Sequence, residues 1–504
     1  MICDTLNPAL IILMILAAAG LSPLVGRIAG AGARWVLAVI PLAAFAYLVA
    51  AAAPVWGGVT WRGSIPWATE LGIDWDLWVS PLGLLLALLV TGIGTLVTIY
   101  AGGYLAKDPN RGRFFAFLFL FMGAMLGLAL TENLIVLFLF WEMTSISSYL
   151  LIGYYHAKLE ARKSALDALL VTAGGGVALL AGIILLGQIG GSYRIGELVA
   201  QHDLVVAHAL YPAAFFCVLA GAVTKSAQFP FHFWLPGAMA APAPVSSYLH
   251  SATMVKAGVF LLAVMHPVLG GTPLWHYSLM VIGTVTMTWA ALVAVVQTDL
   301  KRLLAYTTAS ALGMLVMLLG IESASGAKAA MIFLIVHAFY KGALFMVAGI
   351  LEKTTGTREI TQLRGLVHTM PVLGIAAALA ALSMSGIPPF IGFIAKELIY
   401  EVKLEDPAIG WPLMLCGVLA NAANIVVALK VGIAPFLKSS EDDTPLKMSP
   451  GIGLVLGPVV LGFGGLLFGL FPGIILDGPL AAIVGQIRME PFDVKLALWH
   501  GVNT

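Results

Sequence analysis

Six ionisable side chains lie inside stretches of sequence that are otherwise apolar enough to cross a membrane. They are one glutamate and five lysines: Glu142, Lys225, Lys256, Lys341, Lys396 and Lys430. A charge at the centre of a bilayer costs roughly 2.5–3.5 kcal/mol on insertion scales. Such groups persist only when they are paired, hydrated by internal water, or held in their neutral form. The pattern therefore predicts a path for protons or cations through the membrane.

Glu142 lies near the middle of a predicted span over 133–155. The functional interpretation is a carboxylate whose charge tunes a neighbouring lysine. The structural alternative is a neutral carboxylic acid that is hydrogen-bonded to Ser145 or Ser147. Burial disfavours the ammonium form of a lysine and a nearby carboxylate favours it, so movement of Glu142 relative to Lys225 would make that lysine gain or lose a proton.

Two of the lysines stand close to prolines that interrupt a predicted helix. Pro230 follows Lys225, and the pair Pro388 and Pro389 precedes Lys396. Proline lacks a backbone N–H and clashes with the preceding turn, so we expect a broken helix at both places. Paired broken helices in two halves of a membrane protein indicate a transport site. Packing kinks alone would explain the prolines but would not explain both lysines.

Two histidines accompany the remaining lysines. His250 shares a predicted span with Lys256, and His337 is four residues before Lys341 and so lies on the same helical face. The predicted proton-carrying residues are Glu142, Lys225, His250, His337, Lys341 and Lys396. Lys256 and Lys430 are possible further members of this path, and the alternative for each is an amine that snorkels toward a headgroup or a cavity.

The composition indicates a polytopic, all-α membrane protein: 60% of the 504 residues are hydrophobic and only 10% are charged. Apolar runs of about 20 residues predict about fourteen transmembrane helices. They lie near 9–26, 35–54, 79–100, 113–130, 133–155, 166–189, 208–227, 243–265, 278–296, 303–321, 329–350, 371–398, 409–434 and 452–473. We expect the first run to be a retained span, and residues 1–504 to form one membrane domain with its core at about 80–440.

The two breaks fall five spans apart, which predicts two structural repeats over spans 4–8 and 9–13. Loop charges then set the orientation. Fifteen Lys and Arg residues fall in loops on one side, six on the other and five within spans, which accounts for all 26. The positive-inside rule places the richer side in the cytoplasm and both termini outside.

No cofactor or metal site is expected in this chain. Cys3, Cys217 and Cys416 are far apart and match neither metal nor disulfide spacing. The net charge of +1 gives no reason to expect nucleic acid as a partner. The glycine run Gly174 to Gly176 lies within a predicted helix and favours close helix packing over phosphate binding. The segment Thr298 to Arg302 is interpreted as a helix cap with a cytoplasmic anchor.

Five segments carry a resemblance that covers nearly the whole chain. They are FWEMTSISSYLLIG (140–153), TKSAQFPFHFWLPGAMAAPAPVSSYLHSATMVKAG (224–258), TDLKRLLAY (298–306), HAFYKGALF (337–345) and GIPPFIGFIAKE (386–397). They resemble the antiporter-like subunit family shared by respiratory NADH:quinone oxidoreductase, membrane hydrogenases and Mrp-type cation/proton antiporters. The resemblance implies a central hydrophilic axis, formed by Glu142, Lys225, His250, Lys341 and Lys396.

Two further segments are most similar to the N-terminal part of the large A-type Mrp subunit: GYLAKDPNRGRFFAFLFLFMGAMLGL (103–128) and TTGTREITQLRGL (354–366). Respiratory relatives carry charged residues where this chain has Gly174 to Gly176. Phe333 stands where relatives often have a second histidine, which would thin the relay near His337. A-type subunits continue beyond the stretch at 498–503, so the resemblance implies that the remaining helices are on a separate polypeptide or that this is a truncated form.

The resemblance and the charged axis together predict a subunit of a multisubunit cation/proton antiporter in the cell membrane, a bacterial inner membrane or its equivalent. Protons and Na⁺ are the expected ions, and other membrane subunits and the lipid bilayer are the expected partners. One alternative is a proton-pumping membrane subunit of an NADH:quinone oxidoreductase or membrane hydrogenase, with the redox cofactors in partner chains. Another is a membrane partner of a soluble carbon-capture protein. A purely structural scaffold would not explain the charged axis.

Overall fold

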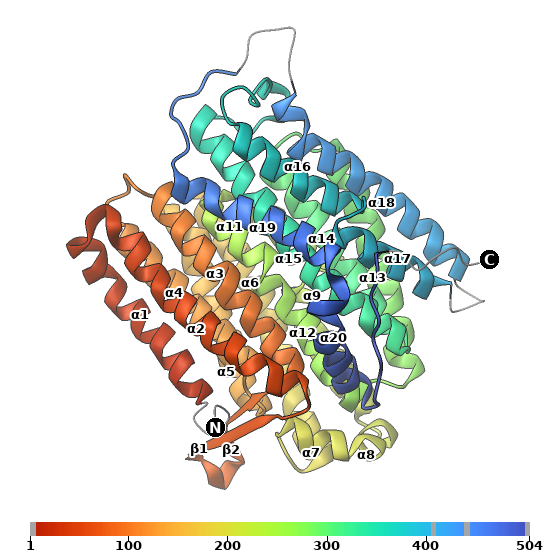
Figure 1. Ribbon diagram of the computed structural model, residues 1–504. Coiled ribbons are helices and arrows are strands. Elements are labelled where there is room, and N and C mark those ends of the chain that lie inside the picture. The colour runs from red at the N-terminus through yellow and green to blue at the C-terminus, as the bar shows by residue number, and fades with distance from the viewer. Residues whose placement is uncertain (1–6, 405–409, 438–443, 499–504) are drawn as a thin grey trace.

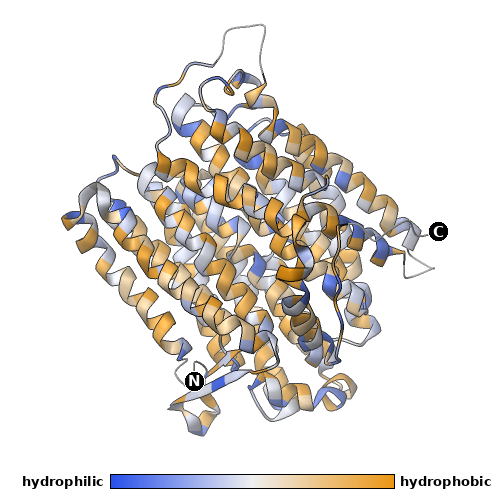
Figure 2. Cartoon of the chain, in the orientation of Figure 1, coloured by the Kyte–Doolittle hydropathy of each residue, from blue (hydrophilic) through white to orange (hydrophobic). Residues whose placement is uncertain are grey.

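The structure is a computed structural model that describes residues 7–404, 410–437 and 444–498, and it is a bundle of long helices (Figure 1). Among these residues, twelve segments are long and apolar enough to cross a membrane. They comprise α1 (Pro8–Ile28), α2 (Ala33–Trp56), α3 (Pro81–Tyr104), α4 (Arg111–Ala129), α5 (Leu134–Ile152), α6 (Leu159–Gly190), α11 (Ala243–Ser251) with α12 (Met254–Leu269), α13 (Pro273–Val296), α14 (Leu300–Gly320), α15 (Ala324–Thr355), α18 (Gly410–Gly432) and α19 (Ile452–Leu470). Hydrophobic residues dominate these helices along their lengths (Figure 2).

The all-α membrane architecture is confirmed, but the count of about fourteen spans is not. Two predicted spans contain the shorter apolar helices α9 (Tyr211–Lys225) and α16 (Pro371–Ser385), each of 15 residues. Both stop at the predicted breaks, which is why they are too short to cross a membrane alone. The other helices are α7 (Ile195–Ala200), α8 (His202–Ala207), α10 (Trp234–Gly237), α17 (Ile391–Lys403) and α20 (Pro472–Arg488).

The proline breaks lie where the sequence places them. α9 ends at Lys225, and the chain passes Pro230 through the 3-10 turns η5 (Phe231–Phe233) and η6 (Ala238–Ala240) before α11 begins. Here the indole N–H of Trp234 donates to the Thr224 carbonyl at 3.0 Å, which satisfies one of the carbonyls freed at the helix end. α16 ends at Ser385, and α17 begins after Pro388 and Pro389.

A third break was not predicted. The span expected over 243–265 consists of two helices, because α11 ends at Ser251 and α12 begins only at Met254. Thr253 lies between them with φ −131° and ψ −104°, outside the helical region, and its hydroxyl donates to the Tyr248 carbonyl at 2.8 Å. The interruption separates His250 from Lys256. Three interrupted helices therefore meet the predicted path, although the two-repeat arrangement stays a prediction.

Helix starts follow ordinary capping chemistry. The Asp299 carboxylate accepts hydrogen bonds from the backbone N–H groups of Lys301 and Arg302 at 2.9 and 3.0 Å, which confirms the predicted cap of α14. The helices α11, α12, α14 and α15 are almost completely buried and form the centre of the bundle. They carry His250, Lys256, His337 and Lys341, so the predicted path runs through the core.

A small antiparallel sheet, which was not predicted, lies between the predicted spans over 35–54 and 79–100. It pairs β1 (Trp61–Ala68) with β2 (Ile73–Val79) at the end of the bundle near the N-terminus (Figure 1). The guanidinium of Arg194 holds it against the helices, with bonds of 2.9 and 3.0 Å to the Asp76 carboxylate. The predicted sides of the two termini concern residues 1–6 and 499–504, which lie outside the described part of the chain.

Candidate functional site

Lys225 is the last residue of α9 and is fully buried against α5. Its Nζ donates to the Trp141 carbonyl at 3.1 Å and to the Ser145 hydroxyl at 2.8 Å, and it lies 5.0 Å from the centroid of the Trp141 ring. Glu142 is on the same turn of α5 and interacts electrostatically with Lys225. Both residues are in the described part of the chain, and no ion pair within 4.0 Å joins them there. The predicted pair is therefore brought together, but it is not locked in a direct contact.

The carboxylate of Glu142 points toward α6. A Cβ atom built on Gly176 would lie 1.9 Å from Glu142 Oε1, and one built on Gly175 would lie 1.8 Å from the Thr224 hydroxyl. The two glycines thus provide the room that the Glu142 carboxylate and α9 occupy, which confirms close packing at the predicted glycine run.

The structural alternative for Glu142, a carboxylic acid hydrogen-bonded to Ser145 or Ser147, names the wrong partners. Ser145 accepts from Lys225 and Ser147 donates to the Met143 carbonyl, so neither bonds the carboxylate. Glu142 Oε1 is buried and has no hydrogen-bond partner within the described residues. An unsatisfied buried carboxylate oxygen is expensive, and it is more consistent with a site that takes up a proton or water than with a finished structural contact.

His250 is fully buried on α11, and neither ring nitrogen has a hydrogen-bond partner in the described part of the chain. Its ring lies between Trp234 and Phe345, with centroid distances of 6.4 and 5.8 Å. Lys256, beyond the break, is also fully buried, and its Nζ donates to the Leu334 carbonyl on α15 at 2.7 Å. The part of the snorkelling alternative that places the Lys256 amine at a headgroup is therefore wrong, because the side chain is fully buried.

His337 and Lys341 lie on one face of α15, as the spacing predicts, and both are fully buried. Lys341 Nζ donates to the Leu304 carbonyl at 3.1 Å and to the Thr307 hydroxyl, whereas both ring nitrogens of His337 lack a partner among the described residues. Lys341 interacts electrostatically with both His250 and His337. The core thus gathers these groups in one place. The Phe333 ring stands 6.3 Å from that of His337 and supplies no polar group there.

Lys396 on α17 donates to the Asn421 side chain on α18. Beside it is a cavity of about 30 Å³ that is also lined by Tyr340 and Phe333 of α15, and that space is enough for a water molecule. The cavity therefore lies between Lys396 and α15, the helix that also carries His337 and Lys341.

Lys430 is not brought to this group. It is half-buried near the end of α18, and its Nζ donates to the Val295 carbonyl near the end of α13 at 2.6 Å. This contact is that of a lysine that caps the carbonyl end of a neighbouring helix.

Two buried lysines were missed because each lies close to a predicted loop. Lys301 was interpreted as a cytoplasmic anchor, but its side chain is 1% exposed and donates to the carbonyls of Met239 and Ala241 at 3.2 and 2.7 Å. Lys403 lies beyond the predicted span over 371–398, but it ends α17 fully buried, and its Nζ has no hydrogen-bond partner among the described residues. Lys301 is only the second residue of α14 and is followed by the charged Arg302, so the sequence carries no clear signal that it is buried.

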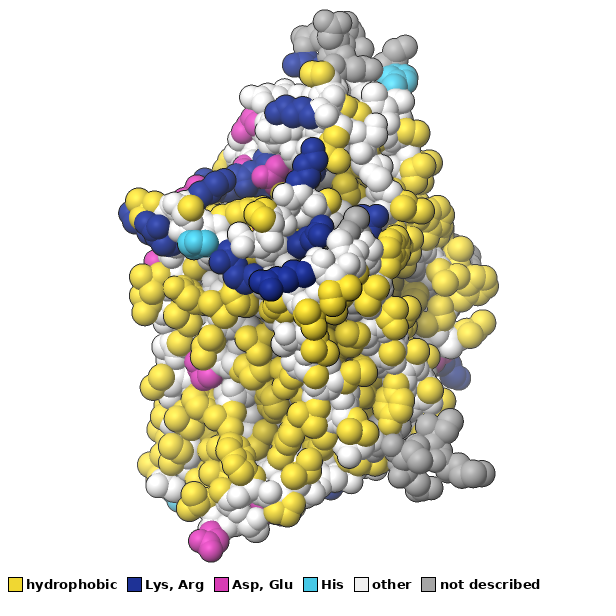
Figure 3. Space-filling model, turned by 90° about the vertical axis from the view of Figure 1, so that its left-hand side faces the viewer, with side chains coloured by type: hydrophobic (Ala, Val, Ile, Leu, Met, Phe, Trp, Pro, Cys, Tyr) yellow, Lys and Arg dark blue, Asp and Glu magenta, His cyan; other side chains and the backbone are white. Residues whose placement is uncertain are grey.

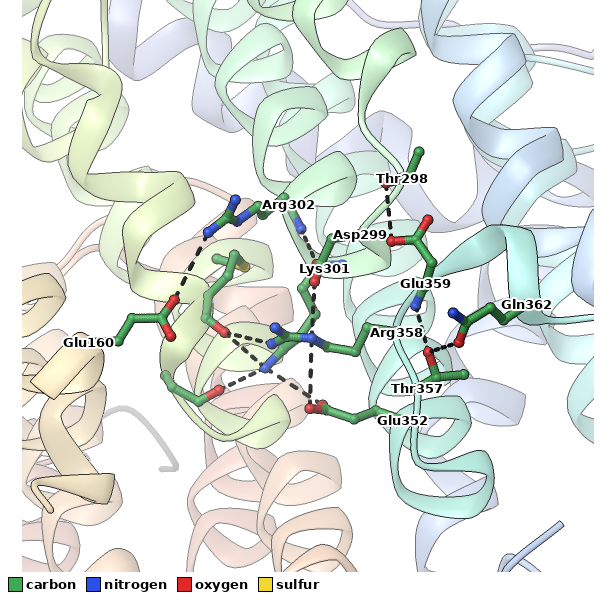
Figure 4. Close-up of polar contacts among 12 residues, drawn as sticks. Glu160, Thr298, Asp299, Lys301, Arg302, Glu352, Thr357, Arg358, Glu359 and Gln362 are labelled. Carbon is green, nitrogen blue, oxygen red and sulfur yellow. Dashed lines mark hydrogen bonds and ion pairs between the residues drawn. The ribbon is translucent and has the colours of Figure 1, made fainter. Parts of the chain in front are cut away.

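Lys301 belongs to a charged network that contacts the chain segment between α9 and α11 (Figure 4). Its Nζ is 3.8 Å from the Glu352 carboxylate of α15. Arg358 lies 3.0 Å from Asp299 and 3.8 Å from Glu352, and it also donates to the Met239 carbonyl. Because Lys301 also interacts electrostatically with His250, this network connects the buried group to the end of the bundle that carries most of the basic loops.

Comparisons with known proteins agree with this geometry. A family model described as "NADH:quinone oxidoreductase/Mrp antiporter, TM" matches residues 131–420, which is more than half of the chain. The chain belongs to the NADH:quinone oxidoreductase/Mrp antiporter membrane family. A second family model, for the N-terminus of chain 5 of complex I, matches residues 65–115. The predicted resemblance is confirmed, and the chain is a multi-pass protein of the cell membrane.

Several curated members of this family are similar over most of the chain. The A-type subunit of the Na⁺/H⁺ antiporter of Alkalihalophilus pseudofirmus is 40% identical over 93% of this chain and 62% of its own length. The corresponding A1-type subunit from Staphylococcus haemolyticus is 38% identical over 93% of this chain and 61% of its own. The chain therefore spans about three-fifths of the length of the curated relatives it matches.

Two solved structures share the family fold. The Mrp complex from Dietzia sp. DQ12-45-1b contains a chain that is 32% identical, with a TM-score of 0.89 over 99% of this chain and 54% of that one. A chain of the membrane-bound sulfane sulfur reductase, an archaeal respiratory membrane complex, has a TM-score of 0.84 at 20% identity, over 95% of this chain and 97% of that one. At that identity, the second likeness concerns the fold alone.

Proposed function

We propose that this chain is a membrane subunit of a multisubunit antiporter that exchanges a monovalent cation, Na⁺, for protons. The observation that carries the proposal is the set of buried ionisable side chains beside three interrupted helices. The names of the curated relatives support Na⁺ and protons as the ions. The similarity to a chain of the Mrp complex supports other membrane subunits as the partners.

Proton movement in this proposal begins at Glu142 and Lys225. An opposite charge stabilises the ammonium form of a buried lysine, and burial without that charge favours the neutral amine. The carboxylate is near Lys225 but turned toward Gly176. A small change in its position therefore alters the balance between the ammonium form and the neutral amine of Lys225. When it moves away from Lys225, the lysine gives up a proton toward the centre of the bundle. When it returns, the lysine takes up a proton again.

The next steps use His250, Lys341 and His337. The two histidines have free ring nitrogens among the described residues, which can accept a proton on one side and release one on the other when water reaches them. Lys341 lies within electrostatic range of both, and the cavity beside Tyr340 leads toward Lys396. The network of Lys301 and Glu352 is a second connection, from His250 to one end of the bundle.

The second candidate is a proton-pumping membrane subunit of a redox enzyme. The descriptions of the two matching family models favour this candidate, because they name NADH:quinone oxidoreductase and complex I. Both candidates use the same buried groups, because the difference between them lies in what the partner chains supply.

Affinity purification in mild detergent separates the two candidates. We expect several small membrane subunits without redox cofactors to accompany the chain, and we expect Na⁺ to drive proton movement in vesicles that contain a pH-sensitive dye. Partner chains with flavin or iron–sulfur clusters, together with no response to Na⁺, would contradict the antiporter and support the redox pump.

Gly176 provides a specific test of the first step. We expect Gly176→Ala to lower exchange, because its methyl group would displace the Glu142 carboxylate, and crowding a filled core costs about 1–3 kcal/mol. Gly174→Ala is the matched control on the same helix, since nothing lies within 4 Å of a Cβ atom there among the described residues. Exchange rates and thermal unfolding of both variants provide the measurement. Equal exchange by the two variants would contradict the proposed role of the Glu142 position.

A further inference from the structure

A cavity of about 650 Å³ opens where α1 ends and α4 begins. None of the residues of the predicted proton path lines it. Four basic side chains do, together with one acidic side chain, Asp108; the basic ones are Arg27, Lys107, Arg111 and Arg113. The cavity is therefore a separate, positively charged feature on the side that the positive-inside rule assigns to the cytoplasm.

Close packing of two helix ends creates this cavity. A Cβ atom on Gly112 would lie 2.9 Å from Pro23 Cα, which is too close without a shift, and one on Gly26 would make a tight contact of 3.3 Å with Gly112 Cα, so the glycines favour the approach. The Arg111 guanidinium crosses the junction and lies 3.4 Å from the carbonyls of Gly26 and Ala106. Arg27 and Arg111 are thereby held near one another despite their like charges.

Four basic side chains and one acidic side chain line the cavity, so a net positive charge remains among the described residues. Within the described residues, no carboxylate lies within 4.0 Å of any of the four basic side chains. Asp108 instead accepts the backbone N–H of Asn110 at 2.8 Å. Arg113 Nε is buried without a hydrogen-bond partner in that part of the chain, and Asn110 provides no side-chain cap for the first turn of α4. The cavity thus presents unused donors and a positive helix end, which suits an anion.

The surface below the cavity indicates whether that anion is a soluble ion or the headgroup of a phospholipid. α1 ends in exposed apolar side chains: Leu21, Leu24 and Ile28 are 56%, 54% and 77% exposed. Figure 3 shows a band of Lys and Arg side chains above a largely hydrophobic face on this side of the molecule. A soluble anion would use only the charged band, whereas a phospholipid would use the charged band and the apolar face together.

We propose that this cavity binds the phosphodiester headgroup of an anionic phospholipid, with the acyl chains lying along the exposed face of α1. The donors that surround the headgroup are the guanidinium groups of Arg27, Arg111 and Arg113 and the ammonium group of Lys107. The bound lipid would fasten the end of α1 to the start of α4.

Lipid retention tests this site in the full chain, purified with the chains that accompany it. The protein is equilibrated with detergent micelles that contain equal amounts of phosphatidylglycerol and phosphatidylcholine, then washed, and its lipids are measured by mass spectrometry. We expect phosphatidylglycerol to be enriched. We expect the double variant Arg27→Gln, Lys107→Gln to retain it roughly 25-fold less, since each basic side chain contributes about fivefold to such binding.

The side chains of the two substituted residues form no hydrogen bond or ion pair within the described residues, so the variant is expected to fold, and its thermal unfolding is compared with that of the parent. The matched control is Lys158→Gln, Lys163→Gln, which removes two exposed charges at the start of α6 on the same side; it is expected to retain phosphatidylglycerol normally. Equal retention of the two lipids by the parent, or an equal loss in both double variants, would overturn the proposal. Displacement of the lipid by soluble glycerol 3-phosphate would show a site for free anions instead.

Discussion

Replacing Lys225 by methionine will lower cation-driven proton movement by about 100-fold, because proton transfer through a positioned side chain contributes roughly 10²–10⁴-fold. Methionine preserves most of the side-chain volume but removes the amine that reaches Trp141 and Ser145. Assembly is expected to persist, because removing a buried cation also removes the cost of its desolvation. Dye-detected exchange in vesicles, with subunit content measured in parallel, provides the test.

Lys430→Met is the control for this prediction. It also removes a lysine from a predicted span, but Lys430 is half-buried and contacts the Val295 carbonyl near a helix end. We expect this variant to exchange ions at close to the parent rate. Normal exchange by assembled Lys225→Met would contradict the role assigned to Lys225.

A related prediction concerns Glu142, which is proposed to act through Lys225. If Glu142 acts by changing the charge state of Lys225, Glu142→Gln will lower exchange, and the double variant with Lys225→Met will be no slower than Lys225→Met alone. Additive losses in the double variant would instead mean that the two residues act independently.

The second large effect is expected at His250. The variant His250→Phe should lose about 100-fold in exchange, since proton transfer through a positioned histidine contributes roughly 10²–10⁴-fold. Its thermal stability should nevertheless be equal or higher, because both ring nitrogens are buried without partners among the described residues, and an apolar ring would relieve that cost. A histidine with a purely structural role would show the opposite result: normal exchange and a less stable protein.

His276→Phe is the matched control for this prediction. His276 Nδ1 lies 2.8 Å from the Gly320 carbonyl, so its ring has a hydrogen-bond partner of the kind that His250 lacks in the described part of the chain. We expect this variant to lose stability, by about 1 kcal/mol for one lost hydrogen bond, and to keep its exchange activity. A loss of stability in His250→Phe equal to that in His276→Phe would argue against a proton-carrying role for His250.

The parts of the site that could be predicted from sequence depend on local chemistry. Pro230, Pro388 and Pro389 break their helices because proline lacks an N–H wherever it occurs. His337 and Lys341 share a face because a helix fixes the direction of residues four apart. Buried ionisable residues stand out in the sequence, since their neighbours are nearly all apolar.

What could not be predicted depends on tertiary packing. The break at Thr253 has no proline or glycine to signal it, and Thr253 adopts a non-helical conformation there with its hydroxyl bonded to the Tyr248 carbonyl. Lys301 and Lys403 lie near predicted loops, and loop charges are expected to be in water. Lys301 is buried because the segment before α11 folds over it, and its amine then bonds the carbonyls of Met239 and Ala241. The hairpin of β1 and β2 was missed because apolar runs of about 20 residues identify only spanning helices, and the hairpin lies between two of these runs.

Hydroxyl-radical footprinting of the assembled protein tests whether water reaches the buried proton path, because it labels side chains that contact water. A hydrated proton path predicts rapid oxidation of Trp234, whose ring is near His250, and of Met384, which lines the cavity beside Lys396. Both should be labelled although their side chains are only 1% and 3% exposed. Met125 and Phe119, which are equally buried in α4 and distant from the path in sequence, should stay unlabelled. If Trp234 and Met384 are protected as well as Met125 and Phe119, the axis is dry, and a proton path through it is contradicted.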